Sequence, residues 1–346
     1  MKKRKIGMKA KIGGLFLAVS AVAFSVTGCQ NSKEETTKET EKQVVKIGTM
    51  DLVNGDLIAR AEKYYESKID AKVEIVPFDS GQDVNKAIAA GSIDLSELGS
   101  SPAALGIANQ LKYDVIGIGD ILGKAEALVA KKGKQIEKIE DLKGKKIATP
   151  FASTGHYSLL HALKFANIKE SEVEILDMEP DDIQAAWQRG DIDAAYVWYP
   201  VLNQLKQDGI ELTNSEELSK KGAITADLLI ARSDFSSKNP EIVTQFLEAL
   251  QEANQLYQTD YKKTVADVSK ILNISEDDAD IQIQGTKWLL ADEQLKEEYL
   301  GGGIAKTLKE TADFLVEQKS ITSAPDLKTF EKHVKTEFLQ KVIDKK

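Results

Sequence analysis

Small polar residues at the start of a predicted helix form the most informative segment of the chain. Residues 147–165 (IATPFASTGHYSLLHALKF) pass from an apolar, strand-like stretch through a loop into an amphipathic helix. The first backbone N–H groups of a helix have no intrahelical partner, and the helix dipole adds positive charge there. The segment therefore predicts an anion site that needs no lysine, made of Ser153, Thr154, Gly155 and His156. An ordinary helix cap after a strand is the alternative.

A second predicted helix start has the same character. Ser100 and Ser101 follow the strand-like residues 93–99, and Pro102 stands near the first turn of the helix after them. Neither this loop nor residues 150–156 contains an arginine or a lysine. Two positive helix ends without a fixed positive charge suit a ligand that carries an anionic group but no net charge.

Two acidic residues and one aromatic residue are candidates for the opposite, cationic end of such a ligand. Asp227 lies within the apolar segment ADLLIA, where an unpaired carboxylate is costly, and Glu126 opens the segment EALVA. Trp198 ends another strand-like segment and could supply an aromatic wall beside a cation. Two alternatives stay open: Asp227 pairs with a nearby basic side chain, and Glu126 is an ordinary residue at a strand end.

Catalytic and metal sites find little support in the sequence. Ser153, His156 and Asp227 could be drawn as a triad, but the G-x-S-x-G elbow that exposes a nucleophile is absent. The chain has three histidines, and its single cysteine is Cys29, so a first-row metal site would depend on carboxylates alone. It also lacks G-x-x-x-x-G-K-[ST] and G-x-G-x-x-G. We expect a protein that is not an enzyme, with no catalytic residues, metal or cofactor.

The first 43 residues predict export and anchoring rather than fold. Residues 1–28 combine six basic residues with an apolar stretch from 12 to 26, as in a signal peptide, and V-T-G-C resembles a bacterial lipobox. That resemblance implies lipidation of Cys29, and residues 29–43 have the composition of a disordered tether. Removing the signal changes the net charge from −9 to about −15, which argues against nucleic acid as a partner.

From residue 44 onward, strand and helix patterns alternate, which predicts an α/β fold of mostly parallel sheets covered by helices. The alternation of strands and helices starts again near residue 140, and a long strand at 223–235 leads into a helical tail. We expect a first lobe at 44–130, a second lobe at 131–225, and a return to the first lobe at 226–346. Ligands of open α/β sheets bind beyond the carboxyl ends of strands, which predicts one cleft between the lobes.

Several segments resemble the periplasmic taurine-binding proteins of the aliphatic-sulfonate branch of ABC-transporter substrate-binding proteins. They are FDSG (78–81), LGSSP (98–102), EALV (126–129), PFASTGHYSLL (150–160), AAWQRGDIDAAYVW (185–198) and the strand around Asp227.

The resemblance implies a two-lobed periplasmic-binding-protein-like fold of type II that captures taurine for a membrane permease and its ATPase. It also implies a monomer, anchored through Cys29 to the outer face of the cell membrane. Another aliphatic sulfonate or a small oxyanion such as nitrate is the alternative ligand. A hydrolase or a surface adhesin on the same fold is the alternative of a different class.

Overall fold

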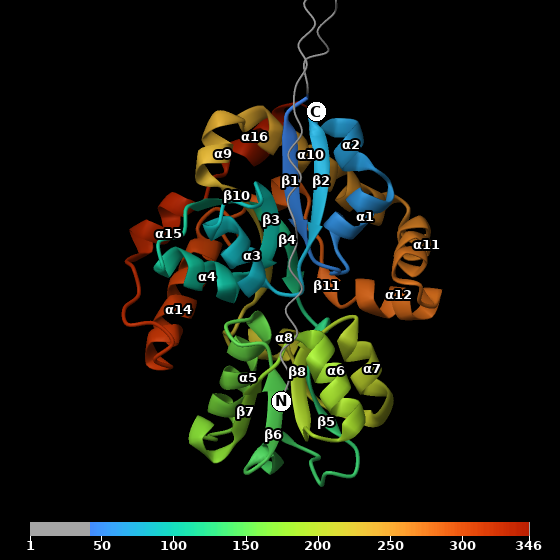
Figure 1. Ribbon diagram of the computed structural model, residues 1–346, viewed down its shortest axis with the longest axis vertical. Coiled ribbons are helices and arrows are strands. Elements are labelled where there is room, and N and C mark those ends of the chain that lie inside the picture. The colour runs from blue at the N-terminus through green and yellow to red at the C-terminus, as the bar shows by residue number, and fades with distance from the viewer. Residues whose placement is uncertain (1–41, 346) are drawn as a thin grey trace, which may run out of the picture. The chain divides into compact units, whose positions relative to one another are not determined.

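Two mixed β-sheets flanked by helices make up the computed structural model, which describes residues 42–345 (Figure 1). Within these residues no helix has both the length and the apolar character needed to cross a membrane. The predicted signal peptide, Cys29 and nearly all of the predicted tether lie outside the described residues.

The first lobe is built on a six-stranded sheet of order β11-β4-β10-β3-β1-β2. Its strands are β1 (Val44–Thr49), β2 (Lys72–Pro77), β3 (Leu95–Gly99), β4 (Tyr113–Leu122), β10 (Ala226–Arg232) and β11 (Thr286–Lys287). The second lobe has a five-stranded sheet of order β7-β6-β8-β5-β9. Its strands are β5 (Glu126–Lys131), β6 (Lys146–Thr149), β7 (Glu174–Asp177), β8 (Ala194–Trp198) and β9 (Gly209–Asn214).

The helices pack on both faces of these sheets. In chain order up to the return strand they are α1 (Gly55–Ala61), α2 (Tyr64–Lys68), α3 (Gly81–Ala89), α4 (Ser100–Ala108), η1 (Ile139–Leu142), α5 (Thr154–Phe165), η2 (Glu170–Glu172), α6 (Pro180–Arg189), α7 (Val201–Asp208) and α8 (Ser215–Ser219). The helical tail contains α9 (Ser233–Lys238), α10 (Pro240–Thr259), α11 (Tyr261–Leu272), α12 (Glu276–Ile283), α13 (Ala291–Gln294), α14 (Gly303–Glu317), α15 (Leu327–His333) and α16 (Glu337–Asp344).

The two sheets share one topology. In each, three parallel strands (β2-β1-β3 and β7-β6-β8) are followed by an antiparallel strand from a distant part of the chain, β10 or β5. The two-lobed α/β fold expected from the sequence is therefore confirmed. The sheets are mixed rather than mostly parallel, because these strands pair antiparallel with the neighbours on both sides.

The expected lobe boundary after residue 130 needs correction. Strand β5 pairs with β8 and β9 and so belongs to the second lobe, which moves the first crossing to residues 123–125. The sequence pattern alone could not assign an apolar strand to one sheet or the other. Strand β9 was not expected, because its sequence GIELTN is polar for a strand and lies at the sheet edge.

Alternating residues of β5 and β8 face opposite sides of the second sheet, as strand geometry requires. Leu128 and Tyr196 pack in a core with α5, whereas Val129 and Val197 pack in a core with α6 and α7. By the same alternation, Glu126 is on the α5 side of its strand. The helical tail packs mainly on the first lobe, but Phe314 near the end of α14 joins the α5 core of the second lobe.

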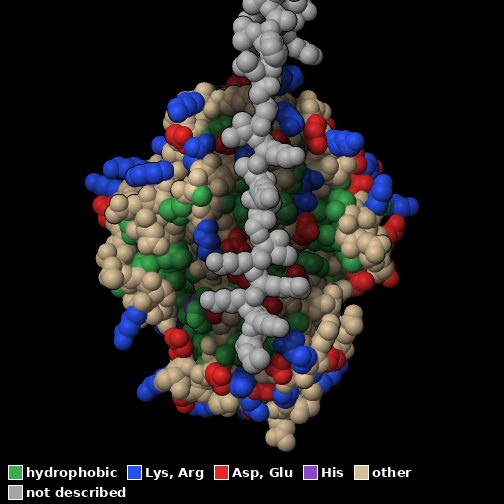
Figure 2. Space-filling model, viewed as in Figure 1, with side chains coloured by type: hydrophobic (Ala, Val, Ile, Leu, Met, Phe, Trp, Pro, Cys, Tyr) green, Lys and Arg blue, Asp and Glu red, His purple; other side chains and the backbone are tan. Residues whose placement is uncertain are grey.

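The outer surface is charged and mixed. On the face shown in Figure 2, lysine and arginine side chains are interspersed with aspartate and glutamate, and they do not gather in a single basic patch. This distribution agrees with a sequence that carries 55 acidic and 46 basic residues.

Candidate ligand-binding site

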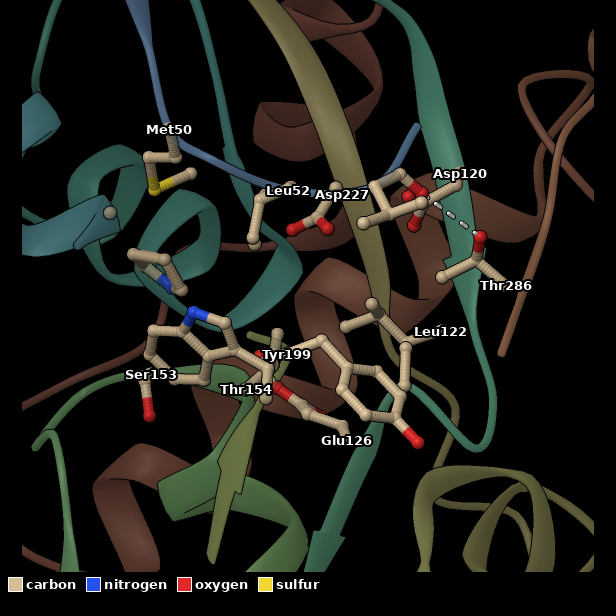
Figure 3. A pocket seen from close by; sticks show the side chains of 16 residues that line it. Met50, Leu52, Asp120, Leu122, Glu126, Ser153, Thr154, Tyr199, Asp227 and Thr286 are labelled. Carbon is tan, nitrogen blue, oxygen red and sulfur yellow. Dashed lines mark hydrogen bonds between the residues drawn. The ribbon is translucent and has the colours of Figure 1, made fainter. Parts of the chain in front are cut away.

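A pocket between the two lobes lies where strand ends and helix starts converge (Figure 3). It contains about 550 Å³ of space, part of it open to solvent. Its lining comes from both sheets: Met50, Leu52, Val53, Gly81, Gly99, Pro102, Asp120, Leu122, Ala125, Glu126, Ser153, Thr154, Trp198, Tyr199, Asp227 and Thr286. The cleft is thus at the carboxyl ends of the parallel strands, where ligands of open α/β sheets bind.

The first-lobe side of the pocket is acidic. Asp120 of β4 and Asp227 of β10 are directly paired across the antiparallel ladder, and both side chains are buried. Burial raises the pKa of both carboxyls well above the usual value, and each is raised further by a neighbouring acid, Glu97 for Asp120 and Asp120 for Asp227. Two such groups cannot both hold a full negative charge at low cost.

Glu97 extends this acidic group behind the pocket. Its Oε2 accepts a hydrogen bond from Asn54 Nδ2 at 2.9 Å, whereas its Oε1 is buried without a partner among the described residues. Burial, followed by the charge of Asp56, raises the pKa of Glu97 well above its usual value. The buried Oδ1 of Asp120 likewise lacks a partner in the described part of the chain.

Among the described residues, Arg60 forms ion pairs with Asp51 and Asp56 but not with Glu97, Asp120 or Asp227. Arg60 Nε donates to Asp56 Oδ2 at 2.9 Å, and its terminal nitrogens donate to Asp51 and to the Met50 carbonyl. No arginine, lysine or histidine is among the 16 described residues that line the pocket. A cationic group on the ligand would therefore meet buried carboxyls here without competition from a basic side chain of the pocket lining.

The second-lobe side carries the start of helix α5. Ser153 is its N-cap: its hydroxyl accepts from the His156 N–H at 3.0 Å and donates to the Pro150 carbonyl at 2.6 Å. The first two N–H groups of the helix, on Thr154 and Gly155, have no intrahelical acceptor. They are the groups available to an anion, and the helix dipole favours that charge.

Helix α4 belongs to the first lobe and begins directly after the end of strand β3, so its N-terminus also points toward the cleft. Gly99, its N-cap, and Pro102, in its first turn, line the pocket. Ser100 Oγ accepts from the Ala226 N–H at 3.4 Å, which fixes this turn against β10. The Ser101 hydroxyl is buried and has no partner among the described residues.

Glu126 is held inside the second lobe by hydroxyl groups. Thr154 Oγ1 donates to its Oε1, and Ser215 Oγ donates to its Oε2 at 2.8 Å. Ser215 is in turn 3.0 Å from the Tyr196 hydroxyl. Burial raises the pKa of Glu126 to about 7, although both hydroxyl hydrogen bonds oppose the rise. Glu126 is therefore no surface residue, and its side chain joins the first turn of α5 to the first turn of α8.

His156 has a structural environment. Its ring stacks on Phe151 with centroids 4.5 Å apart, and its Nδ1 accepts from the Ala152 N–H at 3.3 Å. Burial lowers the pKa of His156 to about 4, so the ring is neutral near pH 7. A neutral ring that accepts from the backbone through Nδ1 adds no positive charge to the anion end.

Apolar and aromatic residues separate the two polar ends. In Figure 3, Leu52 lies beside Asp227, whereas Leu122 and the Tyr199 ring lie on the side toward Thr154 and Glu126. Met50 and Trp198 also line the pocket. A ligand that bridges both ends must therefore have a short apolar body.

The pocket brings together five of the nine residues expected from the sequence: Glu126, Ser153, Thr154, Trp198 and Asp227. The other four do not line it: Ser100, Ser101 and Gly155 are adjacent in sequence to lining residues, and His156 is two residues from Thr154. Asp120 and Tyr199 were missed. The signal for Asp120 was present as an acidic residue next to an apolar strand, but its pairing with Asp227 required the register of β4 and β10.

A resident metal ion has no evident site. Within residues 42–345, no group of three or more histidine, cysteine, aspartate or glutamate side chains is arranged to hold one.

Comparison with known proteins relates most of the chain to one group. Residues 53–260 match the family model described as NMT1/THI5 like. The chain is 37% identical to the taurine-binding periplasmic protein of Escherichia coli over 331 residues, covering 94% of this chain and 96% of that one. It is 27% identical to a putative aliphatic sulfonates-binding protein of Bacillus subtilis, with 96% and 97% covered.

A solved structure supports the fold. The alkanesulfonate-binding protein SsuA of Xanthomonas axonopodis pv. citri, bound to MOPS, superposes with a TM-score of 0.71 at 21% identity. The match covers 85% of this chain and 99% of that one, so the two proteins share the architecture of both lobes and of most of the helical tail.

Proposed function

The chain belongs to the NMT1/THI5-like family and, within it, to the aliphatic-sulfonate branch of ABC-transporter substrate-binding proteins, and on this premise we propose that it captures taurine. Taurine is a short zwitterion with a primary ammonium at one end and a permanent sulfonate at the other. Its capture between the lobes would deliver it to the permease and ATPase of an importer.

The observation that carries the proposal is the separation of charge across the pocket. Asp120 and Asp227 are acceptors for an ammonium, and the first N–H groups of α5 are donors for a sulfonate. A buried carboxylate paired with an ammonium regains much of the energy lost on burial. Simple anions such as nitrate satisfy the second end and face repulsion from the first.

Closure of the lobes provides the transport signal in this proposal. Contacts already link the lobes beside the pocket: Ser80 Oγ lies 3.4 Å from Glu179 Oε1, and Gly99 packs against Thr154. Hinge closure on a ligand is a common behaviour of two-lobed binding proteins. The segments at 123–125 and 220–225, which connect the sheets, are the candidate hinges.

The proposal includes an extracytoplasmic location and a lipid anchor. The relatives named above include a periplasmic protein, which supports an extracytoplasmic location for this chain. Lipidation of Cys29 would hold the binding protein at the outer face of the membrane, near the permease. We expect it to act there as a monomer.

The catalytic alternative draws little support from the geometry. The Ser153 hydroxyl donates to the Pro150 carbonyl rather than to His156, and Asp227 is on the opposite lobe. A hydrolytic triad needs these three groups linked by hydrogen bonds.

A calorimetric panel on the protein lacking residues 1–28 tests the proposal. We expect taurine to bind more tightly than ethanesulfonate, and sulfate and nitrate to bind weakly or not at all. Ethanesulfonate keeps the anion and the two-carbon body but lacks the amine. If ethanesulfonate binds more tightly than taurine, the acidic side of the pocket does not bind an ammonium, and the ligand is a simpler sulfonate.

A further inference from the structure

An ionised Glu126 carboxylate would repel an anion bound at the start of α5. Its carboxyl group contacts Thr154 at the first turn of α5, where the proposed function places the sulfonate. Only 1% of Glu126 is exposed, and its second oxygen accepts from Ser215. A carboxylate in this position repels the ligand and also takes the Thr154 hydroxyl proton that the ligand could use.

The Thr154 hydroxyl has one proton and faces two acceptors. Because Thr154 lines the pocket, that proton is directed either to Glu126 or to the ligand. The oxygen of the same hydroxyl can accept a hydrogen bond, so a protonated Glu126 is able to reverse the bond between them.

We propose, building on the proposed function, that Glu126 is a positioning residue that sets the direction of the Thr154 hydroxyl. The protonated acid donates to Thr154 Oγ1 and frees the hydroxyl proton for the anionic end of the ligand. The ionised carboxylate instead accepts the hydrogen bond from the Thr154 hydroxyl, so that the ligand faces a lone pair of Thr154 Oγ1. Binding of a sulfonate therefore draws one proton from solvent onto Glu126 whenever the acid is ionised.

The surroundings of Glu126 favour this exchange near neutral pH. Burial, opposed by the hydrogen bonds from Thr154 and Ser215, raises the pKa of Glu126 to about 7. The groups that face it are the hydroxyls of Thr154 on α5 and Ser215 on α8, with the Tyr196 hydroxyl of β8 next to Ser215 and the carboxyls of Asp120 and Asp227 across the pocket. No basic side chain lines this pocket within the described residues, so the surroundings contain no cation that would hold Glu126 ionised.

The test measures affinity against pH for wild type and Glu126→Gln with two ligands, ethanesulfonate and taurine. A glutamine amide donates to Thr154 at every pH and accepts from Ser215, so it imitates the protonated acid. In wild type the Glu126 contribution lowers affinity by about tenfold for each pH unit above about 7. In Glu126→Gln this contribution disappears.

Two ligands are needed because Asp120 and Asp227 also titrate. Their ionisation strengthens binding of taurine, which has an ammonium, and weakens binding of ethanesulfonate, which has none. The slope of log affinity against pH differs between wild type and Glu126→Gln. This difference has the same sign for both ligands only if the titrating group acts on the anionic end of the ligand. Thr154→Val removes the switched hydroxyl and should also flatten the profile, whereas Thr154→Ser should retain the slope.

The outcomes distinguish the role of Glu126 from the proposed capture of taurine. Equal pH slopes in wild type and Glu126→Gln for both ligands overturn the role of Glu126 while leaving taurine capture intact. Should Glu126→Gln fail to fold, the comparison of Thr154→Val with Thr154→Ser decides the same question, and equal slopes there overturn the role. Failure of wild type to bind either sulfonate at any pH overturns the proposed function itself.

Discussion

Asp120 and Asp227 lie directly opposite each other on the antiparallel strands β4 and β10, at the edge of a pocket that both line. Glu97 adds a third buried carboxyl behind them. Like charges at this spacing are stable only if they share protons or if a cation joins them. The pair therefore defines the end of the pocket that a ligand ammonium would enter.

Replacing Asp227 by asparagine should weaken taurine binding by about a hundredfold, or ~3 kcal/mol, because the ammonium is left without its anionic partner. Ethanesulfonate has no ammonium, so its affinity should stay the same or improve once the carboxylate is removed. Paired calorimetric titrations of both ligands measure the effect. Equal loss for both ligands would mean that Asp227 has a structural role only.

Asp114→Asn provides the matched control on strand β4. Asp114 accepts hydrogen bonds from Ser233 and Ser236 at the far end of the strand and does not line the pocket. Its substitution should leave both affinities unchanged, so that a change in ligand preference can be assigned to the pocket acid.

Gly99→Ala should weaken ligand binding by keeping the lobes apart. A Cβ atom at Gly99 would lie 2.6 Å from Thr154 Cγ2 on the other lobe, whereas its φ of −59° accepts any residue. The expected loss of taurine affinity is about tenfold, since overpacking a closed contact typically costs about 1–3 kcal/mol. Isothermal calorimetry measures the loss.

A double-mutant cycle locates the cause of that loss. Thr154→Ser removes Cγ2 and keeps the hydroxyl, so the Gly99→Ala/Thr154→Ser protein should recover most of the affinity lost in Gly99→Ala. Additive losses in the double variant would show that the methyl groups do not meet when the ligand binds.

His161→Phe should make the protein less sensitive to acid. The His161 ring packs 4.4 Å from the Phe314 and Tyr157 rings, and both its nitrogens lack partners among the described residues. Burial lowers the pKa of His161 to about 4, below the value of 6.5 for an exposed histidine. Between these values the unfolded chain binds the proton more tightly, so stability falls as the pH falls from 6.5 toward 4.

Thermal melts at pH 7 and pH 5 measure this effect. The drop in melting temperature between the two should be smaller for His161→Phe than for wild type, because phenylalanine keeps the stacking and cannot be protonated. An unchanged drop would mean that His161 remains accessible to protons in the folded state.

Cys29→Ala should release the protein from the membrane. The apolar stretch and V-T-G-C motif predict that the cysteine carries a lipid, and two acyl chains hold a protein far more firmly than one. Labelling cells with a tagged fatty acid should mark wild type and leave Cys29→Ala unmarked. Equal labelling of both proteins contradicts the prediction of anchoring at this residue.

Much of the architecture could be predicted because local patterns determine it. The apolar strands and amphipathic helices were expected near their observed positions, and the start of α5 follows from Ser153 before a helical pattern. The length of the apolar strand 126–130 was equally clear, but its sheet was not. Strand pairing is a contact between distant segments, and an apolar strand buried on both faces fits either sheet.

By itself, the sequence predicted which helix starts could bind an anion and showed that the loops before them carry no basic side chain. Only the tertiary structure decided that Asp120 stands opposite Asp227, and that Glu126 contacts Thr154 rather than solvent. The physical reason is that helix starts and caps depend on neighbouring residues. The register of β4 against β10 and the approach of α5 to β5 depend on packing between segments far apart in the chain.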